Sequence, residues 1–339
     1  MSSNSSTTID FTVQFQLASQ YLSLSLGLFL FITGIVGSFV NIVVFLTLGN
    51  YKHNACSLYM LVGSLLDFFF VFIGMSTRIL TLGFKIDFTL SSQVWCKLRT
   101  VILNTISLSS FTIICLQSLD IFFCTSRSIV MRQKSSVKWA RLLLVACGLV
   151  WIVHEISTMI FQDLVKAGST YSCINTNTIY ASYRSYFVVP ILTVTIPMLM
   201  ISILAFHIYR HLHVLTQGEQ RSFSILTKQL TKMALFQIGS VLLFQAPYGI
   251  SSIYSLATTY VAKTTYRQAQ EKLISNFFGI YVYGIYASPF YCYCLASKRF
   301  RNQVLCVINK IRCNKQRNQV LPIMQDIIKP AGRPQTTTI

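Results

Sequence analysis

Long apolar runs dominate this chain, and seven of them recur between short polar stretches. Each run holds about 20 or more residues with at most one charged side chain, the length that an α-helix needs to cross the hydrocarbon core of a bilayer. The runs cover residues 21–48, 58–76, 101–126, 142–162, 185–208, 233–261 and 273–297. They lack the alternation of membrane-barrel strands, and a backbone in lipid must satisfy its own hydrogen bonds. We therefore predict an all-α membrane protein in which residues 21–297 form a bundle of seven transmembrane helices.

The stretches on either side of this bundle are short. Residues 1–20 are rich in Ser and Thr and lack the basic start of a cleavable signal peptide, so we expect an extracellular tail. Residues 298–310 place Phe300 and Leu305 between basic side chains, which is typical of a short amphipathic helix on the membrane surface. Residues 311–339 are then a cytoplasmic tail.

The charge content supports the membrane prediction. Only 11% of the residues are charged, whereas soluble domains carry about 25%. If the N-terminus lies outside and the chain crosses seven times, about two thirds of the 28 Lys and Arg residues fall on the inner side, as the positive-inside rule requires. The net charge of +19 therefore reflects the topology of a multi-pass protein of the plasma membrane. It does not indicate nucleic-acid binding, since the basic residues form no stripe with interleaved aromatic residues.

Particular residues inside the spans follow one another in a characteristic order. The first span holds GIVGSFVNIVVF with Asn41, the second holds SLLDFFF with Asp67, and Trp95-Cys96 stand at the head of the third. Further along come Trp151, Pro197 followed by HIYRHL, Pro247, and SPFYC at 288–292. Each motif is weak alone, but their order over roughly residues 20–310 resembles the rhodopsin-like (class A) family of G-protein-coupled receptors. The chain looks like a divergent member of that family.

The resemblance implies a polar core formed by Asn41, Asp67, Ser110 and Ser288. In the family, the carboxylate of the second span binds a sodium ion or takes up a proton, and Ser110 stands where a supporting hydroxyl is common. A charged acid in the middle of the membrane costs roughly 2.5–3.5 kcal/mol, so Asp67 is a functional candidate. The alternative is a hydrogen-bonded structural group. No other metal and no organic cofactor is expected.

The resemblance also implies covalent features. Cys96 corresponds to the family's outer cysteine, and Cys173 in the loop before the fifth span is its expected disulfide partner. Asn4 begins an Asn-Ser-Ser glycosylation sequon on the outer side. Cys306 and Cys313 follow the seventh span and are candidates for palmitoylation.

The inner end of the third span departs from the family pattern. Asp120-Ile121-Phe122 stand where the family has Asp-Arg-Tyr, and the family's arginine contacts the G protein. Isoleucine cannot replace the planar, charged guanidinium of arginine. Coupling to a heterotrimeric G protein therefore rests on the resemblance alone, and a non-signalling decoy or scavenger receptor of the same fold is the alternative.

The sixth and seventh spans keep the prolines of the family's switch but not its other residues. Gln245 replaces the tryptophan two residues before the kink proline, Pro247. At the end of the seventh span, Ser288 and Cys292 stand in the places of the asparagine and tyrosine around Pro289. The helical scaffold resembles the family more closely than the switch does.

A predicted ligand pocket lies near the outer ends of the third, sixth and seventh spans. Its candidate residues are Leu103, Asn104, Ser107, Gln245, Tyr248, Phe278 and Tyr281. Leu103 stands where amine receptors carry an aspartate, so a monoamine ligand is not expected. The aromatic and neutral polar side chains, with outer loops richer in basic than in acidic residues, favour an extracellular short peptide or a neutral or acidic small molecule.

Two other functional classes fit the sequence poorly. A transporter or channel should show several intramembrane charges or symmetric broken helices, whereas the spans hold only three acids. An enzyme is not expected either, because we find no metal-binding cluster, phosphate loop or nucleophile elbow in the sequence.

Overall fold

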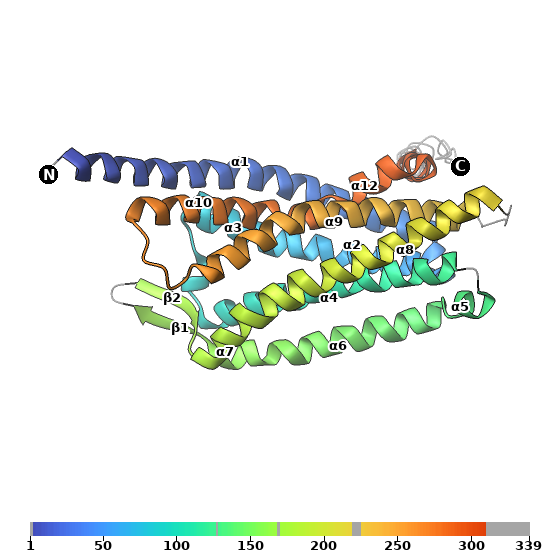
Figure 1. Cartoon of the computed structure of the whole chain (residues 1–339), viewed down its shortest axis with the longest axis horizontal. Coiled ribbons are helices and arrows are strands. Elements are labelled where there is room, and N and C mark those ends of the chain that lie inside the picture. Colours follow the sequence, from blue (N-terminus) through green and yellow to red (C-terminus); the bar gives the residue numbers. More distant parts are fainter. Residues whose placement is uncertain (1–2, 127, 168–169, 219–224, 310–339) are drawn as a thin grey trace, which may run out of the picture. The chain divides into compact units, whose positions relative to one another are not determined.

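The computed structural model describes residues 3–126, 128–167, 170–218 and 225–309 (Figure 1). The chain divides into two compact units, residues 1–297 and residues 298–339. The first unit is a bundle of helices that run side by side, with one β-hairpin at an end of the bundle. The second unit contributes a helix over residues 298–309.

Six helical segments of the described part are long and apolar enough to cross a membrane. Four of them are unbroken helices: α1 (Ser3–Leu48), α4 (Gln93–Thr125), α6 (Val137–Phe161) and α9 (Ile225–Ala257). A fifth comprises α2 (Ala55–Phe70), η2 (Val71–Met75), α3 (Ser76–Arg78) and η3 (Ile79–Gly83). The sixth comprises α7 (Thr178–Tyr183), η5 (Arg184–Thr195) and α8 (Ile196–Gly218). Both composite segments contain π-helical turns, which often mark functional sites.

Short elements and side-chain caps define where these segments begin. The connections contain η1 (Asn50–Lys52), η4 (Phe88–Leu90) and α5 (Ile129–Gln133). Asn54 caps α2 by accepting a hydrogen bond from the Ser57 amide at 3.0 Å. Asn177 caps α7 in the same way, through the Tyr180 amide at 3.0 Å.

The region of the seventh predicted span is broken into three helices. These are α10 (Thr265–Tyr281), α11 (Gly284–Ala287) and α12 (Pro289–Ala296). At the first break the Tyr283 amide donates to the Ile280 carbonyl at 3.0 Å, a tight i→i−3 turn. At the second, Pro289 has no amide hydrogen to continue the α-helical ladder. No single helix of this region reaches spanning length, so the seventh span stays a prediction.

The surface of α6 explains why these helices belong in a membrane. Leu142, Val145, Leu149, Val153 and Ile160 are each more than half exposed. A soluble protein rarely exposes a continuous apolar surface of this size, because water penalises it. Exposed apolar side chains also run along α1 and α8. The chain is therefore a multi-pass membrane protein.

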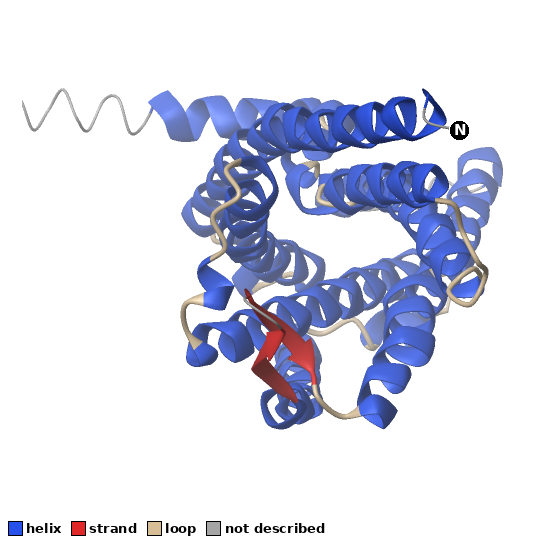
Figure 2. Cartoon of the chain, turned by 90° about the vertical axis from the view of Figure 1, so that its left-hand side faces the viewer, coloured by secondary structure: helices blue, strands red, loops and turns tan. Residues whose placement is uncertain are grey.

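A β-hairpin connects α6 to α7 and was not predicted. Strands β1 (Gln162–Ala167) and β2 (Thr170–Asn175) pair antiparallel, and Figure 2 views the bundle from the end that carries them. Cys173 on β2 forms a disulfide with Cys96 on α4, with 5.9 Å between their Cα atoms. This confirms the predicted pair and ties the hairpin to the start of α4.

Helix α1 is longer than the first predicted span. It begins at Ser3, so the predicted tail of residues 1–20 is helical from residue 3 onward. Polar and aromatic contacts hold this extension: Asn276 donates to the Ser19 hydroxyl at 2.9 Å, and the rings of Phe15 and Tyr266 lie 5.6 Å apart. Contact with α10 thus continues the helix beyond the apolar run.

The second unit is helical over residues 298–309, where the amphipathic helix was predicted, and of the two apolar residues named there Phe300 is buried and Leu305 is exposed. Phe300, Val304 and Val307 share one face by their helical spacing. Cys306 is an exposed free cysteine on this helix. Cys313 and the side chain of Asn4 lie outside the described residues.

Candidate functional site

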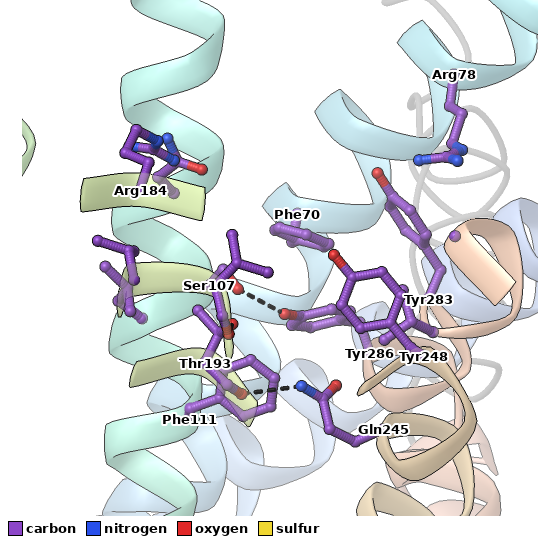
Figure 3. A pocket seen from close by; sticks show the side chains of 16 residues that line it. Phe70, Arg78, Ser107, Phe111, Arg184, Thr193, Gln245, Tyr248, Tyr283 and Tyr286 are labelled. Atoms are coloured by element: carbon purple, nitrogen blue, oxygen red, sulfur yellow. Dashed lines mark hydrogen bonds between the residues drawn. The ribbon is translucent and has the colours of Figure 1, made fainter. Parts of the chain in front are cut away.

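A cavity of about 190 Å³ lies inside the bundle, in the half nearer the hairpin (Figure 3). Its position follows from its wall residues on α4, which begin eight residues after the disulfide-bonded Cys96. Residues from α2, α3, α4, η5, α9, α10 and α11 contribute to the wall. The cavity is lined by Phe70, Arg78, Asn104, Ser107, Leu108, Phe111, Arg184, Val188, Val189, Thr193, Gln245, Tyr248, Gly279, Val282, Tyr283 and Tyr286.

Four of the seven predicted pocket residues line this cavity: Asn104, Ser107, Gln245 and Tyr248. Leu103 instead faces Gly74 on η2.

The other two predicted residues, Phe278 and Tyr281, pack away from the cavity. The Phe278 ring lies 5.1 Å from that of Phe277, and the Tyr281 ring lies 4.8 Å from that of Phe244. The break after α10 turns the chain, so Tyr283 and Tyr286 reach the cavity instead. Neither Phe278 nor Tyr281 lines the cavity, although both lie on α10 before this break.

Two hydrogen bonds connect opposite walls of the cavity (Figure 3). The hydroxyls of Ser107 and Tyr286 lie 3.1 Å apart and join α4 to α11. The Gln245 amide nitrogen donates to the Thr193 carbonyl at 2.9 Å and joins α9 to η5. The other atom of this amide, Gln245 Oε1, is buried without a partner. Gln245, which was predicted to stand at a switch position, therefore forms part of the cavity wall.

A buried acid on α6 organises one side of the cavity. Glu155 is fully buried and accepts from the Arg184 guanidinium and the Asn104 amide, each at 3.1 Å. The Thr158 hydroxyl donates to the same carboxylate at 2.7 Å, and His154 Nδ1 lies 3.1 Å from its other oxygen. Because Glu155 pairs with Arg184, the charge of this arginine is compensated.

A second arginine, Arg78 on α3, lines the cavity without such compensation. Among the described residues, no carboxylate lies within ion-pair distance of it, and its Nε is buried without a hydrogen-bond partner. Its guanidinium interacts with the Tyr283 hydroxyl and lies over Gly279, which has no side chain to displace it. In the predicted topology, Arg78 is one of the Lys and Arg residues that fall on the outer side.

The acids at the hairpin end are engaged elsewhere. Glu271 on α10 pairs with Lys263 and with Arg267, and the Lys263 ammonium is the largest cause that lowers its pKa. Asp163 on β1 lies 3.8 Å from the Lys97 ammonium. These carboxylates therefore do not compensate Arg78.

The predicted polar core is only partly assembled. Asp67 is buried, and the Ser110 hydroxyl donates to it at 3.3 Å. Ser288 instead donates to the Ser240 hydroxyl at 3.1 Å, while Asn41 Oδ1 is buried without a partner. One carboxylate with a neighbouring hydroxyl is an oxygen-rich pair of the kind that hard cations prefer, so Asp67 and Ser110 fit a sodium ion.

At the opposite end of α4, Asp120 accepts a hydrogen bond from the Ser135 hydroxyl at 2.6 Å. Its carboxylate is buried and also interacts with the Cys56 backbone amide. Ile121 is only 2% exposed, and the Phe122 ring lies 6.0 Å from His207. The side chain in the place of the family's arginine is therefore buried.

A further polar link that the sequence analysis missed joins three helices near that end. Gln237 on α9 accepts from the Gln117 amide on α4 at 3.1 Å and from the Tyr293 hydroxyl on α12 at 2.8 Å. Cys292 was predicted to stand in the place of the family's tyrosine, and the next residue, Tyr293, is a buried tyrosine. A one-residue shift next to Pro289 is the signal that could have revealed it.

Comparison with protein-family models and with curated proteins gives no match for this chain.

Proposed function

We propose that the chain is a divergent receptor of the rhodopsin-like type, with seven spans in the plasma membrane and its N-terminus outside. It binds an extracellular ligand in the cavity and signals to a heterotrimeric G protein. The observation that carries the proposal is the cavity itself, which is built by segments from across the bundle next to the disulfide-bonded hairpin. A ligand there contacts several helices at once.

The switching step follows from the contacts of α9. Pro247 interrupts its backbone ladder, and Gln245 links it to η5. A ligand that replaces the Gln245 bond in one conformation and not in the other shifts the equilibrium by that difference in affinity. Movement of α9 about Pro247 then strains or breaks the link among Gln117, Gln237 and Tyr293 at the other end.

Asp67 and Ser110 support the same proposal as a candidate sodium site. A bound cation would compensate the buried carboxylate and favour the conformation in which this hydrogen bond is made. The chemistry supplied by the ion is charge compensation only.

One observation favours a non-signalling decoy as the second candidate. Ile121 is buried and carries no charge, so the G protein would have to bind without the arginine contact that the family uses. The two candidates share the outer cavity and differ only in the response at the inner face.

We would test the proposal by nucleotide exchange on G proteins mixed with the full-length chain in lipid nanodiscs. The probes are a library of short peptides and small organic acids, each also scored for binding. A signalling receptor accelerates exchange with any binding probe, and Pro247→Ala lowers that response while binding persists. Binding without exchange, restored by Ile121→Arg, would establish the decoy. If probes bind but accelerate nucleotide exchange neither with the unmodified chain nor with Ile121→Arg, G-protein signalling is refuted.

A further inference from the structure

The geometry points to a ligand that carries a carboxylate, held by Arg78, on a small aromatic or apolar body. This inference rests on the proposed function in one respect, namely that the cavity is the ligand site. It adds the chemical class of the ligand and the residue that selects it.

The charge of the cavity wall indicates a single anionic group. Two arginines line the cavity, Arg78 and Arg184, and one of them is compensated by the buried Glu155 at 3.1 Å. Arg78 has no carboxylate within ion-pair distance in the described part of the chain. Arg99 adds a further positive charge nearby, because its Nε donates to the hydroxyl of Thr77, the neighbour of Arg78, at 3.1 Å. A monoanion in the cavity would compensate the uncompensated guanidinium.

The environment of Arg78 suits a planar carboxylate. Its Nε is buried without a partner, and a guanidinium binds a carboxylate through two parallel N–H donors. Tyr283 offers a hydroxyl beside the same guanidinium, and Figure 3 shows Arg78 and Tyr283 facing one another. Gly279 leaves room for the guanidinium, since a side chain there would meet its nitrogen atoms.

The rest of the cavity suits a ring-sized apolar group. Phe70, Phe111, Tyr248 and Tyr286 form much of its wall. Its volume is about 190 Å³, and an apolar cavity of about 150 Å³ can hold one benzene molecule. The C-terminal residue of a peptide and a small aromatic acid offer this same chemistry, so the test must separate the two sources.

The test measures the thermal unfolding of the full-length chain in nanodiscs, because a ligand that binds only the folded state raises the melting temperature. The probes are phenylacetate and 3-phenylpropanoate, each beside its amide, and tripeptides ending in Phe as free acid and as C-terminal amide. We expect the acids to raise the melting temperature and the amides to fail. Stabilisation by the peptide acids alone would assign the source to a peptide terminus, and stabilisation by the small acids would assign it to organic acids.

Variants identify the residue that selects the acid. Arg78→Gln should weaken acid binding about 10- to 100-fold, the loss expected for hydrogen bonds to a charged group. Arg78→Lys keeps the charge but not the paired donors, so it should retain intermediate affinity. Lys272→Gln removes a charge from an exposed residue of α10 outside the cavity wall and should bind like the unmodified chain. The melting temperature without probe shows whether each variant is folded.

Three results would overturn the inference. They are equal binding of acids and amides, unchanged acid binding by a folded Arg78→Gln chain, and no binding of any acid in the series. Failure of the proposed function looks different, because acids would then bind through Arg78 without accelerating nucleotide exchange. Conversely, if only uncharged probes accelerated nucleotide exchange, the chain would be a receptor, and the inference that its ligand carries a carboxylate would be refuted.

Discussion

Glu155 shows how this bundle accommodates a charge on a helix that is otherwise apolar. Its carboxylate is fully buried, and Arg184, Asn104 and Thr158 all donate to it. Burial of a charge in a medium of low dielectric constant is tolerated only when partners and hydrogen bonds compensate it. The cluster therefore holds α6, α4 and η5 together at one wall of the cavity.

Glu155→Gln should lower the free energy of unfolding by about 3 kcal/mol, because it leaves the charge of the partly buried Arg184 without its partner. Unfolding in a titration with denaturing detergent measures the change. Adding Arg184→Gln to the variant removes the uncompensated charge and should recover part of the loss. A double variant as unstable as the single one would show that the pair contributes no charge compensation.

Asp67→Asn should abolish the effect of sodium on stability. If sodium is present at about ten times its dissociation constant, binding to the folded chain adds about 1.4 kcal/mol. The melting temperature of the unmodified chain should thus be higher in sodium chloride than in choline chloride at equal ionic strength. Ser110→Ala, which removes the donor at 3.3 Å, should weaken the sodium effect, and Asp67→Asn should show none. An equal sodium effect in Asp67→Asn would exclude this carboxylate as the site.

At the scale of the elements, the sequence predicted most of the helices and missed the places where they change. Apolar runs with at most one charged residue identified the six long segments, because lipid demands continuous apolar helices. The same reasoning joined α10, α11 and α12 into one span, since hydropathy does not reveal a tight turn at Val282–Tyr283. Phe278 and Tyr281, which precede this turn, were assigned to the cavity, whereas Tyr283 and Tyr286, which follow it, line the cavity. The hairpin was missed because its strands are too short and polar to stand out.

Tyr293→Phe tests the link between α4, α9 and α12. It removes one of the two hydrogen bonds to Gln237 and should cost about 1 kcal/mol of stability. If the link holds the resting conformation, the variant should also raise nucleotide exchange without any probe. The matched control is Tyr291→Phe, because the Tyr291 hydroxyl donates to the Thr33 carbonyl at an exposed site. Equal effects of the two variants would contradict a special role for Tyr293.

The disulfide joins the hairpin to α4, so its loss should act on both elements. Cys96→Ser should lower stability by about 2–4 kcal/mol, because the bridge closes a loop across a sequence separation of 77 residues. A reducing agent should lower the melting temperature of the unmodified chain to about that of Cys96→Ser. The melting temperature of Cys96→Ser itself should not change in the reducing agent. Cys306→Ser, at an exposed free cysteine, serves as the control. A reduced chain with an unchanged melting temperature would contradict this account.

At the scale of the whole molecule, the number of crossings determines which parts of the chain share a side of the membrane. The apolar flanks of α1, α6 and α8 show that the chain is an integral membrane protein. Six helices meet the length of a span within the described residues, and the three short helices from Thr265 to Ala296 would complete a seventh. Charge asymmetry favours the odd number, because it places most Lys and Arg residues on one side.

Epitope tags at the two termini distinguish six crossings from seven. With seven, antibodies should bind an N-terminal tag on intact cells and a C-terminal tag only after the membrane is permeabilised. Tags on the same side would show an even number and would refute the proposed topology.

The length of α1 determines how far the helix extends on the N-terminal side of residue 21. It has 46 residues, and the 18 that precede Tyr21 rise about 27 Å as a helix. The bond from Asn276 to Ser19 and the packing of Phe15 on Tyr266 brace this length against α10. The residues before the first predicted span therefore form a helix held against α10, and not a flexible tail. A protein fused ahead of α1 would be separated from residue 21 by about 27 Å of helix, and it would move less freely than on a flexible linker.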